Sequence, residues 1–279
     1  MKKISRRSFL AAAGLSVAAL ALTACGGSSA STASSMASSA ASSEAASTSA
    51  AAGELTTVEA GKLTMATNAA FPPYEMTTDA GEFEGIDIET AQAIADKLGL
   101  ELQIDDMDFD AALLSVQQGK ADIVMAGVTV TDERKAVMDF SDSYATGIQS
   151  IIVPEGSDIA SPDDLAGKKI GTQRGTTGYI YCSDDFGDDS VVAYDDGLTA
   201  VQALNNGQVD AVVIDNAPAK EFVAANPGLV ILDTSYAEED YAIGMAKGSS
   251  LEDAVNAALE ELKADGTLQS IVDKYITAE

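Results

Sequence analysis

The sequence predicts an α/β protein built from two similar lobes, and two observations carry this prediction. Apolar strand patterns alternate with helical patterns from residue 62 onward. In addition, residues 110–125 can be laid over residues 198–213 with both glycines and both aspartates in register. Each copy reads as an amphipathic helix, a glycine stop and an apolar strand, which is the βα unit of a parallel sheet. Because any βα unit has this pattern, the repeat indicates architecture more than function.

The start of the chain has the layout of an export signal. Four cations among the first seven residues precede an apolar run over residues 9–22 and then Cys25. This order is typical of a bacterial lipoprotein signal, so we expect residues 1–24 to be removed and Cys25 to carry a lipid. The Arg6-Arg7 pair also fits a twin-arginine signal, which leaves two export routes open. Residues 25–54 are rich in Ser, Ala and Gly, so we expect them to form the lipidated cysteine and a flexible tether.

Composition excludes several kinds of protein. The chain has 16 Lys+Arg against 44 Asp+Glu, a net charge of −28, so it lacks the basic surface that nucleic-acid binding needs. It has no histidine, which removes the commonest general base and the commonest metal ligand. We therefore expect no cofactor and no metal. Cys182, left alone once Cys25 is lipidated, is expected to be a small buried apolar residue, with a reactive thiol as the alternative.

The first half of the chain after the tether predicts a strand over residues 62–67, a helix over residues 87–98 and a strand over residues 100–104. A second helix follows, which residues 108–110 cap at its start and which ends at Gly119. Two prolines stiffen the loop after the first strand, and this loop carries Phe71 and Tyr74. Rings held there can face a cleft, although core filling is the ordinary use of an aromatic side chain and in an average protein would apply to at least one of them.

An anion-binding turn is predicted at residues 126–135, after the apolar run 123–125. A strand that ends there in a polar turn opening a helix would gather backbone N–H groups, hydroxyls and Arg134 around one point. Arginine can grip a carboxylate through two parallel hydrogen bonds. The alternative is a surface arginine at the start of a helix.

The second half repeats this arrangement. After a strand over 148–153 and a further strand from residue 169, residues 173–178 form a second turn suited to an anion, without the lysine of a phosphate-binding loop. Asp215 follows a buried strand at the position where open α/β sheets bind ligands, so it could hold an ammonium group or cap a helix. Thr146-Gly147 is a candidate hinge crossing. Residues 241–246 read as a last strand, followed by helical patterns on either side of Gly266.

Six short stretches together resemble the extracellular solute-binding proteins of polar amino acid ABC importers, the group that includes the glutamine-, histidine- and lysine/arginine/ornithine-binding proteins. They are residues 69–75, 85–88, 127–134, 139–141, 175–177 and 213–215. The resemblance implies a type II periplasmic-binding-protein fold with two lobes, each a mainly parallel sheet flanked by helices, and two hinge crossings. Residues 55–146 with 241–279 would form lobe 1, and residues 147–240 would form lobe 2.

The resemblance also implies a ligand site between the lobes. The ligand α-carboxylate would meet Arg134, Thr129, Gly127 and Thr177. The α-ammonium would meet Asp215, with Gly127 and Thr129. The ligand side chain would meet Asn68, Phe71, Tyr74, Gln173 and Thr176. Opposite charges on opposite lobes would let a zwitterion favour the closed state. Asn68 stands where better-known members commonly have an aspartate, and Gln173 stands where the glutamine-binding protein has a lysine. Without a carboxylate at residue 68, a neutral polar side chain is favoured over lysine or arginine.

The expected function is that of a lipoprotein, anchored to the outer face of the bacterial cytoplasmic membrane, which captures a polar amino acid and delivers it to a membrane permease. We expect a monomer that is not an enzyme. Two alternatives remain open: a cyclohexadienyl dehydratase-like enzyme on the same fold, with Glu75 and Asp215 as its acid or base, and a sensory amino acid-binding module.

Overall fold

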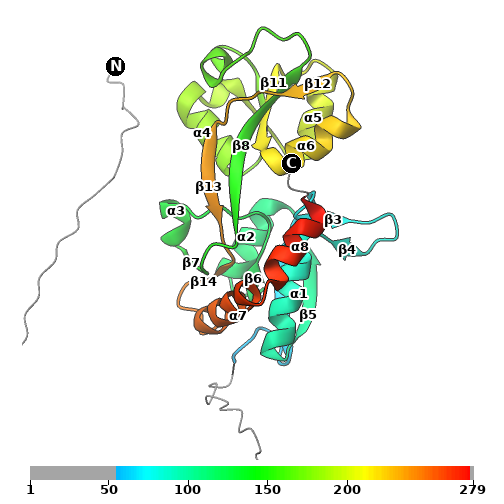
Figure 1. Cartoon of the computed structure of the whole chain (residues 1–279). Helices are drawn as coiled ribbons and strands as arrows, with labels where there is room; N and C mark the ends of the chain where they lie inside the picture. The colour runs from blue at the N-terminus through cyan, green and yellow to red at the C-terminus, as the bar shows by residue number, and fades with distance from the viewer. Residues whose placement is uncertain (1–54, 277–279) are drawn as a thin grey trace, which may run out of the picture. The chain divides into compact units, whose positions relative to one another are not determined.

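The computed structural model describes residues 55–276. The expected signal, Cys25 and the tether lie outside the described residues. The described residues form two larger sheets flanked by helices and a small sheet of β2 (Ala70–Phe71), β3 (Glu75–Thr77) and β4 (Phe83–Glu84). Each larger sheet belongs to one lobe (Figure 1).

The first lobe is built on a five-stranded sheet with the order β5-β1-β6-β14-β7. Its strands are β1 (Lys62–Thr67), β5 (Glu101–Asp106), β6 (Ile123–Val124), β7 (Met138–Phe140) and β14 (Gly244–Ala246). Its longer helices are α1 (Ile86–Leu98), α2 (Phe109–Gln117), α7 (Glu252–Ala264) and α8 (Thr267–Tyr275). Strands β5, β1 and β6 are parallel, whereas β14 runs antiparallel to both of its neighbours.

The second lobe is built on the order β10-β9-β11-β8-β12, with β13 also paired to β8. Its strands are β8 (Ala145–Pro154), β9 (Ile170–Gln173), β10 (Val191–Tyr194), β11 (Ala211–Asp215), β12 (Leu229–Ile231) and β13 (Ala237–Tyr241). Its helices are η1 (Pro162–Leu165), α4 (Thr177–Phe186), η2 (Asp188–Ser190), α5 (Gly197–Asn205) and α6 (Asn216–Ala225). Strands β10, β9 and β11 pair in parallel, and β8 runs antiparallel to its neighbours β11, β12 and β13. One strand in each larger sheet therefore runs against the others, β14 in the first and β8 in the second, so both sheets are mixed but mainly parallel, as expected.

Two strands cross between the lobes side by side. Strands β8 and β13 pair antiparallel, with Gly147 opposite Glu239 and Ala145 opposite Tyr241 (Figure 1). The strand expected over residues 241–246 is in fact two strands, because β13 ends at Tyr241 in the crossing and β14 begins at Gly244 in the first sheet. A Cβ atom at Gly147 would lie 2.4 Å from the Tyr241 ring, so this glycine makes room for that ring. The lobe boundaries at residues 146/147 and 240/241 stay a prediction.

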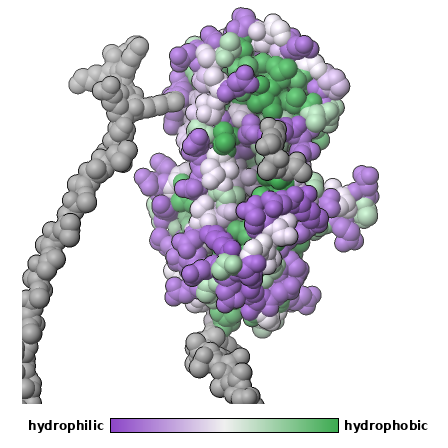
Figure 2. All heavy atoms as spheres, viewed as in Figure 1, coloured by the Kyte–Doolittle hydropathy of each residue, from purple (hydrophilic) through white to green (hydrophobic). Residues whose placement is uncertain are grey.

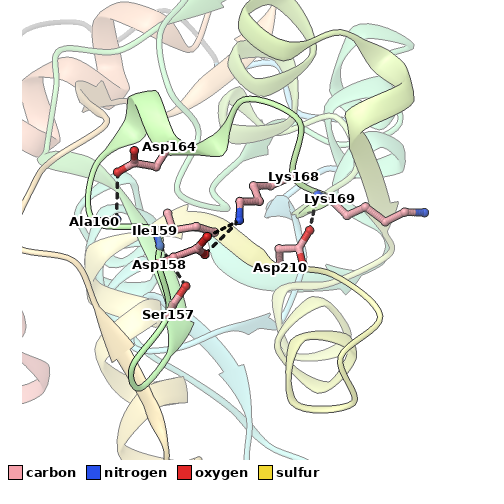
Figure 3. A network of polar contacts seen from close by, with 8 residues as sticks. All are labelled: Ser157, Asp158, Ile159, Ala160, Asp164, Lys168, Lys169 and Asp210. Atoms are coloured by element: carbon pink, nitrogen blue, oxygen red, sulfur yellow. Dashed lines mark hydrogen bonds and ion pairs between the residues drawn. The ribbon is translucent and has the colours of Figure 1, made fainter.

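The internal repeat is borne out by matching hydrogen bonds in the two lobes. In the first, the Asp122 N–H donates to the Thr64 carbonyl and the Thr64 N–H donates to Asp122 Oδ2. In the second, the Asp210 N–H donates to the Lys169 carbonyl at 2.8 Å, and the Lys169 N–H donates to Asp210 Oδ2 at 2.7 Å, the bond drawn in Figure 3. Each aspartate thus precedes one strand and ties it to the start of the neighbouring strand, which explains why both copies place an aspartate there.

The glycines of the repeat also match. Gly119 and Gly207 have φ of 65° and 67°, in the left-handed region where a glycine ends a helix without strain.

Cys182 is fully buried, and burial raises the pKa of its thiol to about 12, in keeping with the apolar role expected for it.

Hydrophilic residues cover most of the face seen in Figure 2, with an apolar area on the lobe that contains α5 and α6. None of the helices between residues 55 and 276 combines the length and apolar character of a membrane span.

Candidate functional site

The turn before α3 (Asp132–Lys135) buries its arginine instead of exposing it. Thr131 caps this short helix by accepting the Arg134 N–H, which fixes where the arginine side chain starts. The Arg134 guanidinium donates to the Thr129 carbonyl at 2.7 Å and to the Gly175 carbonyl of the other lobe at 3.1 Å. Its central carbon lies 5.4 Å from the centre of the Phe109 ring. With Arg134 only 8% exposed, the alternative of a plain surface arginine does not hold.

Burial lowers the pKa of the Arg134 guanidinium from its ordinary value, and the nearby carboxylate of Glu239 opposes this shift. The group stays charged, because an arginine pKa remains far above neutral pH. Two of its five donors are engaged by the two carbonyls above. The others leave it able to bind a carboxylate oxygen.

The second turn faces the same space from the other lobe. Thr176 caps α4 by accepting the Tyr179 N–H at 3.3 Å. The first N–H groups of a helix have no acceptor within the helix and carry its positive end, so the start of α4 suits an anion. Thr177, its first residue, is buried and its hydroxyl donates to Glu239.

Asp215 ends β11 and stands at the N-cap position of α6, yet its side chain makes no capping bond. Its carboxylate accepts hydrogen bonds from Gln149 Nε2 at 2.8 Å and from the Tyr241 hydroxyl instead. Burial raises the pKa of Asp215 to about 7, and these hydrogen bonds work in the opposite direction. Of the two roles that the sequence left open, a buried anion held for a ligand cation fits this geometry.

A small cavity between the two lobes brings most of the predicted residues together. Its lining consists of Asn68, Phe71, Glu75, Phe109, Ala126, Gly127, Thr129, Arg134, Gln173, Thr176, Thr177 and Asp215. Tyr74 is not among them: its ring packs on Phe71 and, edge to face, on Tyr241, with centroids 6.0 and 5.3 Å away. Phe71 is both a core residue and a wall of the cavity.

Gly127 can serve only one of the two roles predicted for its backbone. Its φ of 55° suits glycine, and a Cβ atom there would lie 2.9 Å from the Phe71 ring. Its N–H donates to Asp87 Oδ2 at 3.0 Å. The carbonyl of Gly127 remains, and a carbonyl accepts hydrogen bonds, so it suits an ammonium group and not a carboxylate.

Two primary amides meet at the end of the cavity expected to hold the ligand side chain. Gln173 Nε2 donates to Asn68 Oδ1 at 2.8 Å and to the Asp195 carbonyl at 3.3 Å. Asn68 Nδ2 donates to the Met107 carbonyl at 3.0 Å. Both N–H hydrogens of Gln173 are thereby engaged, so its Oε1 atom and a lone pair of Asn68 Oδ1 are left as acceptors. This end of the cavity suits a side chain that carries N–H donors.

Sequence reasoning missed several residues of the site. Glu239 is 7% exposed and bonds Thr129, Thr177 and Gln149; Gln149 in turn bonds Asp215. The signal for Gln149 was a lone amide within an apolar strand. Glu239 is separated by one residue from Tyr241, and this spacing puts both side chains on one face of a strand. Within residues 55–276, no group of three or more Cys, Asp or Glu side chains is placed to hold a metal ion.

Comparisons with known proteins find relatives that are amino acid-binding proteins. The L-cystine-binding protein TcyJ of Escherichia coli (strain K12) is 33% identical over 226 residues, which cover 79% of this chain and 85% of TcyJ. A probable histidine-binding protein of Neisseria gonorrhoeae is 32% identical over 276 residues, which cover 96% of this chain and 95% of that protein. Among solved structures, an ancestral arginine-binding protein bound to glutamine has a TM-score of 0.75 and 42% identity, covering 78% of this chain and 99% of its own.

These similarities extend over both lobes, and the solved neighbours have the two-lobed fold of amino acid-binding proteins. The family model of bacterial extracellular solute-binding proteins, family 3, matches residues 63–278. This match begins at the second residue of β1 and spans the rest of the described chain, including every residue that lines the cavity. The chain therefore belongs to the bacterial extracellular solute-binding proteins, family 3.

Proposed function

We propose that this protein is the substrate-binding component of an ABC importer, which closes its two lobes on one polar amino acid and delivers it to a membrane permease. One observation carries the proposal: Arg134 from the first lobe and Asp215 from the second are both buried and line one cavity. A zwitterion can satisfy both charges at once only when the lobes are closed. Ligand binding would therefore shift the population toward the closed state that a permease can recognise.

The proposed ligand orientation follows from the donors and acceptors in the cavity. Its α-carboxylate meets Arg134 and the start of α4, and its α-ammonium meets Asp215 and the Gly127 carbonyl. The side chain then extends toward Asn68 and Gln173, which offer acceptors. A carboxamide carries N–H donors and no charge, so glutamine is the first ligand to test. A guanidinium also carries N–H donors, which makes arginine the main competitor.

The named relatives are binding proteins, which supports binding over catalysis as the role of the cleft. We further propose that the mature protein begins at Cys25 and is held by a lipid at the outer face of the cytoplasmic membrane as a monomer. Mass spectrometry of the membrane-extracted protein would test the lipid. Turnover of a cyclohexadienyl acid by the purified protein would contradict the binding role.

Isothermal titration calorimetry of residues 55–279 against the standard amino acids tests the central proposal. We expect one polar amino acid, glutamine first, to bind with a dissociation constant in the micromolar range or below, about −8 kcal/mol or more favourable. If none of the twenty binds in this range, the transport function is wrong.

A further inference from the structure

Glu239 lies in the crossing strand β13, and its carboxylate accepts hydrogen bonds from the hydroxyl groups of the two threonines that flank the cavity. Its Oε2 atom accepts from Thr129 Oγ1 at 3.1 Å and from Thr177 Oγ1 at 2.9 Å. Thr129 comes from the turn before α3, and Thr177 begins α4, so one oxygen atom bonds residues from both sides of the cleft. All three side chains are less than a tenth exposed.

A hydroxyl group has one proton and two lone pairs. Once that proton is donated to Glu239, the oxygen can only accept further hydrogen bonds. The two threonine oxygens lie 3.5 Å apart, and each has already committed its proton to the carboxylate. Toward the cavity, both hydroxyls therefore present lone pairs.

Gln149, in the crossing strand β8, also donates hydrogen bonds to acidic side chains. Its Nε2 atom donates to Asp215 Oδ2 at 2.8 Å and to Glu239 Oε2 at 3.1 Å, so the two carboxylates are linked through one amide. Because both N–H hydrogens of Gln149 point at acids, this amide cannot turn to donate toward a ligand carboxylate. The shorter hydrogen bonds of this cluster run toward Asp215 and Glu239, and a longer one of 3.5 Å runs from Gln149 Nε2 to Thr177 Oγ1, which accepts it.

We propose that Glu239 is a positioning residue which, by holding the hydroxyl protons of Thr129 and Thr177, makes these hydroxyls acceptors for the ligand α-ammonium and not donors to its α-carboxylate. The proposal rests on the proposed function, because it concerns the amino group of an amino acid in the same cavity. It resolves the double role expected for Thr129: the side chain serves the ammonium, and the carboxylate is left to Arg134 and backbone N–H groups.

The experiment compares an amino acid with the analogue that lacks only the α-amino group, using L-glutamine with glutaramic acid and L-arginine with desamino-arginine. Calorimetry is done on wild type, Glu239→Met and Glu239→Gln. Methionine removes the acceptor, so we expect the amino acid to bind about tenfold more weakly while the desamino analogue is unaffected or binds more tightly. Glutamine keeps an oxygen acceptor, so it should retain the wild-type affinity within about threefold. Glu238→Met, at the exposed neighbouring position, is the matched control and should change neither affinity.

Thr129→Val keeps the proposal testable if Glu239→Met does not fold. We expect this variant to weaken the amino acid and to leave the desamino analogue unchanged, because only an ammonium needs the hydroxyl oxygen. Equal loss for both ligands would mean that Thr129 donates to the carboxylate, which overturns the proposal. Equal loss in Glu239→Gln and Glu239→Met would overturn it too, because charge alone would then explain the effect. If the wild type binds no amino acid, the proposed function fails and this inference fails with it. If the wild type binds one but Glu239→Met leaves the ratio of amino acid affinity to desamino-analogue affinity unchanged, this inference alone fails.

Discussion

Gln173 Nε2 donates a hydrogen bond of 2.8 Å to Asn68 Oδ1, and this buried bond joins the end of β9 in one lobe to the residue after β1 in the other. A direct bond between the lobes at this point means that the ligand side chain meets both amides only when the cleft is closed. The pair therefore contributes to closure and to the choice of ligand through the same atoms.

Asn68→Asp should move the ligand preference toward cationic side chains. The carboxylate can still accept from Gln173, but it places a negative charge at the end of the cavity, where it would attract a guanidinium. We expect the ratio of arginine to glutamine affinity, measured by calorimetry, to rise by about tenfold or more.

Asn205→Asp makes the same chemical change at an exposed position outside the cavity and serves as the control. Its affinity ratio should match that of the wild type. An unchanged ratio in Asn68→Asp would show that residue 68 does not face the ligand side chain.

Gly175→Ala should oppose closure of the lobes. Gly175 has φ of 74°, and a Cβ atom there would lie 1.7 Å from Asp110 Oδ1 of the other lobe. The side chain of Asp110 is exposed and can move, but the backbones could no longer approach as closely. We expect ligand affinity to fall about tenfold, and small-angle scattering to show a less compact protein in the presence of ligand.

Gly187→Ala separates this steric effect from backbone strain. Gly187 has φ of 84° and ψ of 151°, a backbone region essentially confined to glycine, and nothing lies within 4 Å of its Cβ position, so the variant carries backbone strain of about 1–3 kcal/mol without the contact. It should lose stability and keep its affinity. Similar affinity losses in both variants would rule out a role for the contact between Gly175 and Asp110.

Ligand affinity should fall as the pH drops below about 7. Burial raises the pKa of Asp215 to about 7 in the ligand-free protein, whereas an ammonium partner requires the carboxylate form. Below this pH, binding must first remove a proton from Asp215, which costs up to about tenfold in affinity per pH unit. Calorimetry in buffers of different ionisation enthalpy would detect the released proton. In Asp215→Asn the affinity should be low and independent of pH; a wild-type affinity that is flat between about pH 5 and about pH 8 would contradict this assignment.

Glu75→Gln should leave the protein stable at neutral pH and make it more stable than the wild type at alkaline pH. Glu75 is fully buried beside Asp87, and burial followed by the charge of Asp87 raises its pKa well above the ordinary value. A carboxyl group whose pKa is raised by folding favours the folded state while it is protonated. This contribution is complete below the ordinary carboxyl pKa, falls as the pH rises from there and is lost once the pH passes the raised folded pKa, whereas glutamine does not ionise.

Urea denaturation at neutral and at alkaline pH measures this difference, with the exposed Glu84→Gln as the control that should show none. A loss of about 3 kcal/mol or more in Glu75→Gln at neutral pH would mean that Glu75 is an ionised, paired carboxylate and not a neutral acid.

Local patterns were enough to predict much of this structure. Glycine stops, strand runs and the two aspartates at 122 and 210 each reflect interactions within a few residues or between neighbouring strands, so the sequence states them directly. Arg134 could be placed in the site for the same reason, since Thr131 caps the short helix that positions it. The position of the one reversed strand in each sheet, β14 in the first and β8 in the second, could not be predicted because its pairing depends on contacts far apart in the sequence.

Glu239 shows where sequence reasoning stopped. Its neighbours Glu238 and Asp240 are both exposed acids, so the segment looks like charged surface in a chain that has 44 acidic residues. Strand alternation assigns Glu239 to the same face as Tyr241, but only if the strand begins before Tyr241. Because residue 239 is not apolar, the alternation of apolar residues does not mark it as buried. Its hydrogen-bond partners are two threonines more than 60 residues away, which the local sequence does not reveal.

The measurement that bears most directly on the whole account is calorimetric titration of Arg134→Met with the amino acid that the wild type binds, beside Arg174→Met as a matched control. Arg174 lies outside the cavity, and its side chain is 55% exposed and pairs with Asp195. Arg134→Met should lose at least about a hundredfold in affinity, because a charge-assisted pair of hydrogen bonds to the carboxylate disappears. Arg174→Met should bind like the wild type. Tight binding retained by a folded Arg134→Met would remove Arg134 from the site and contradict the zwitterion clamp.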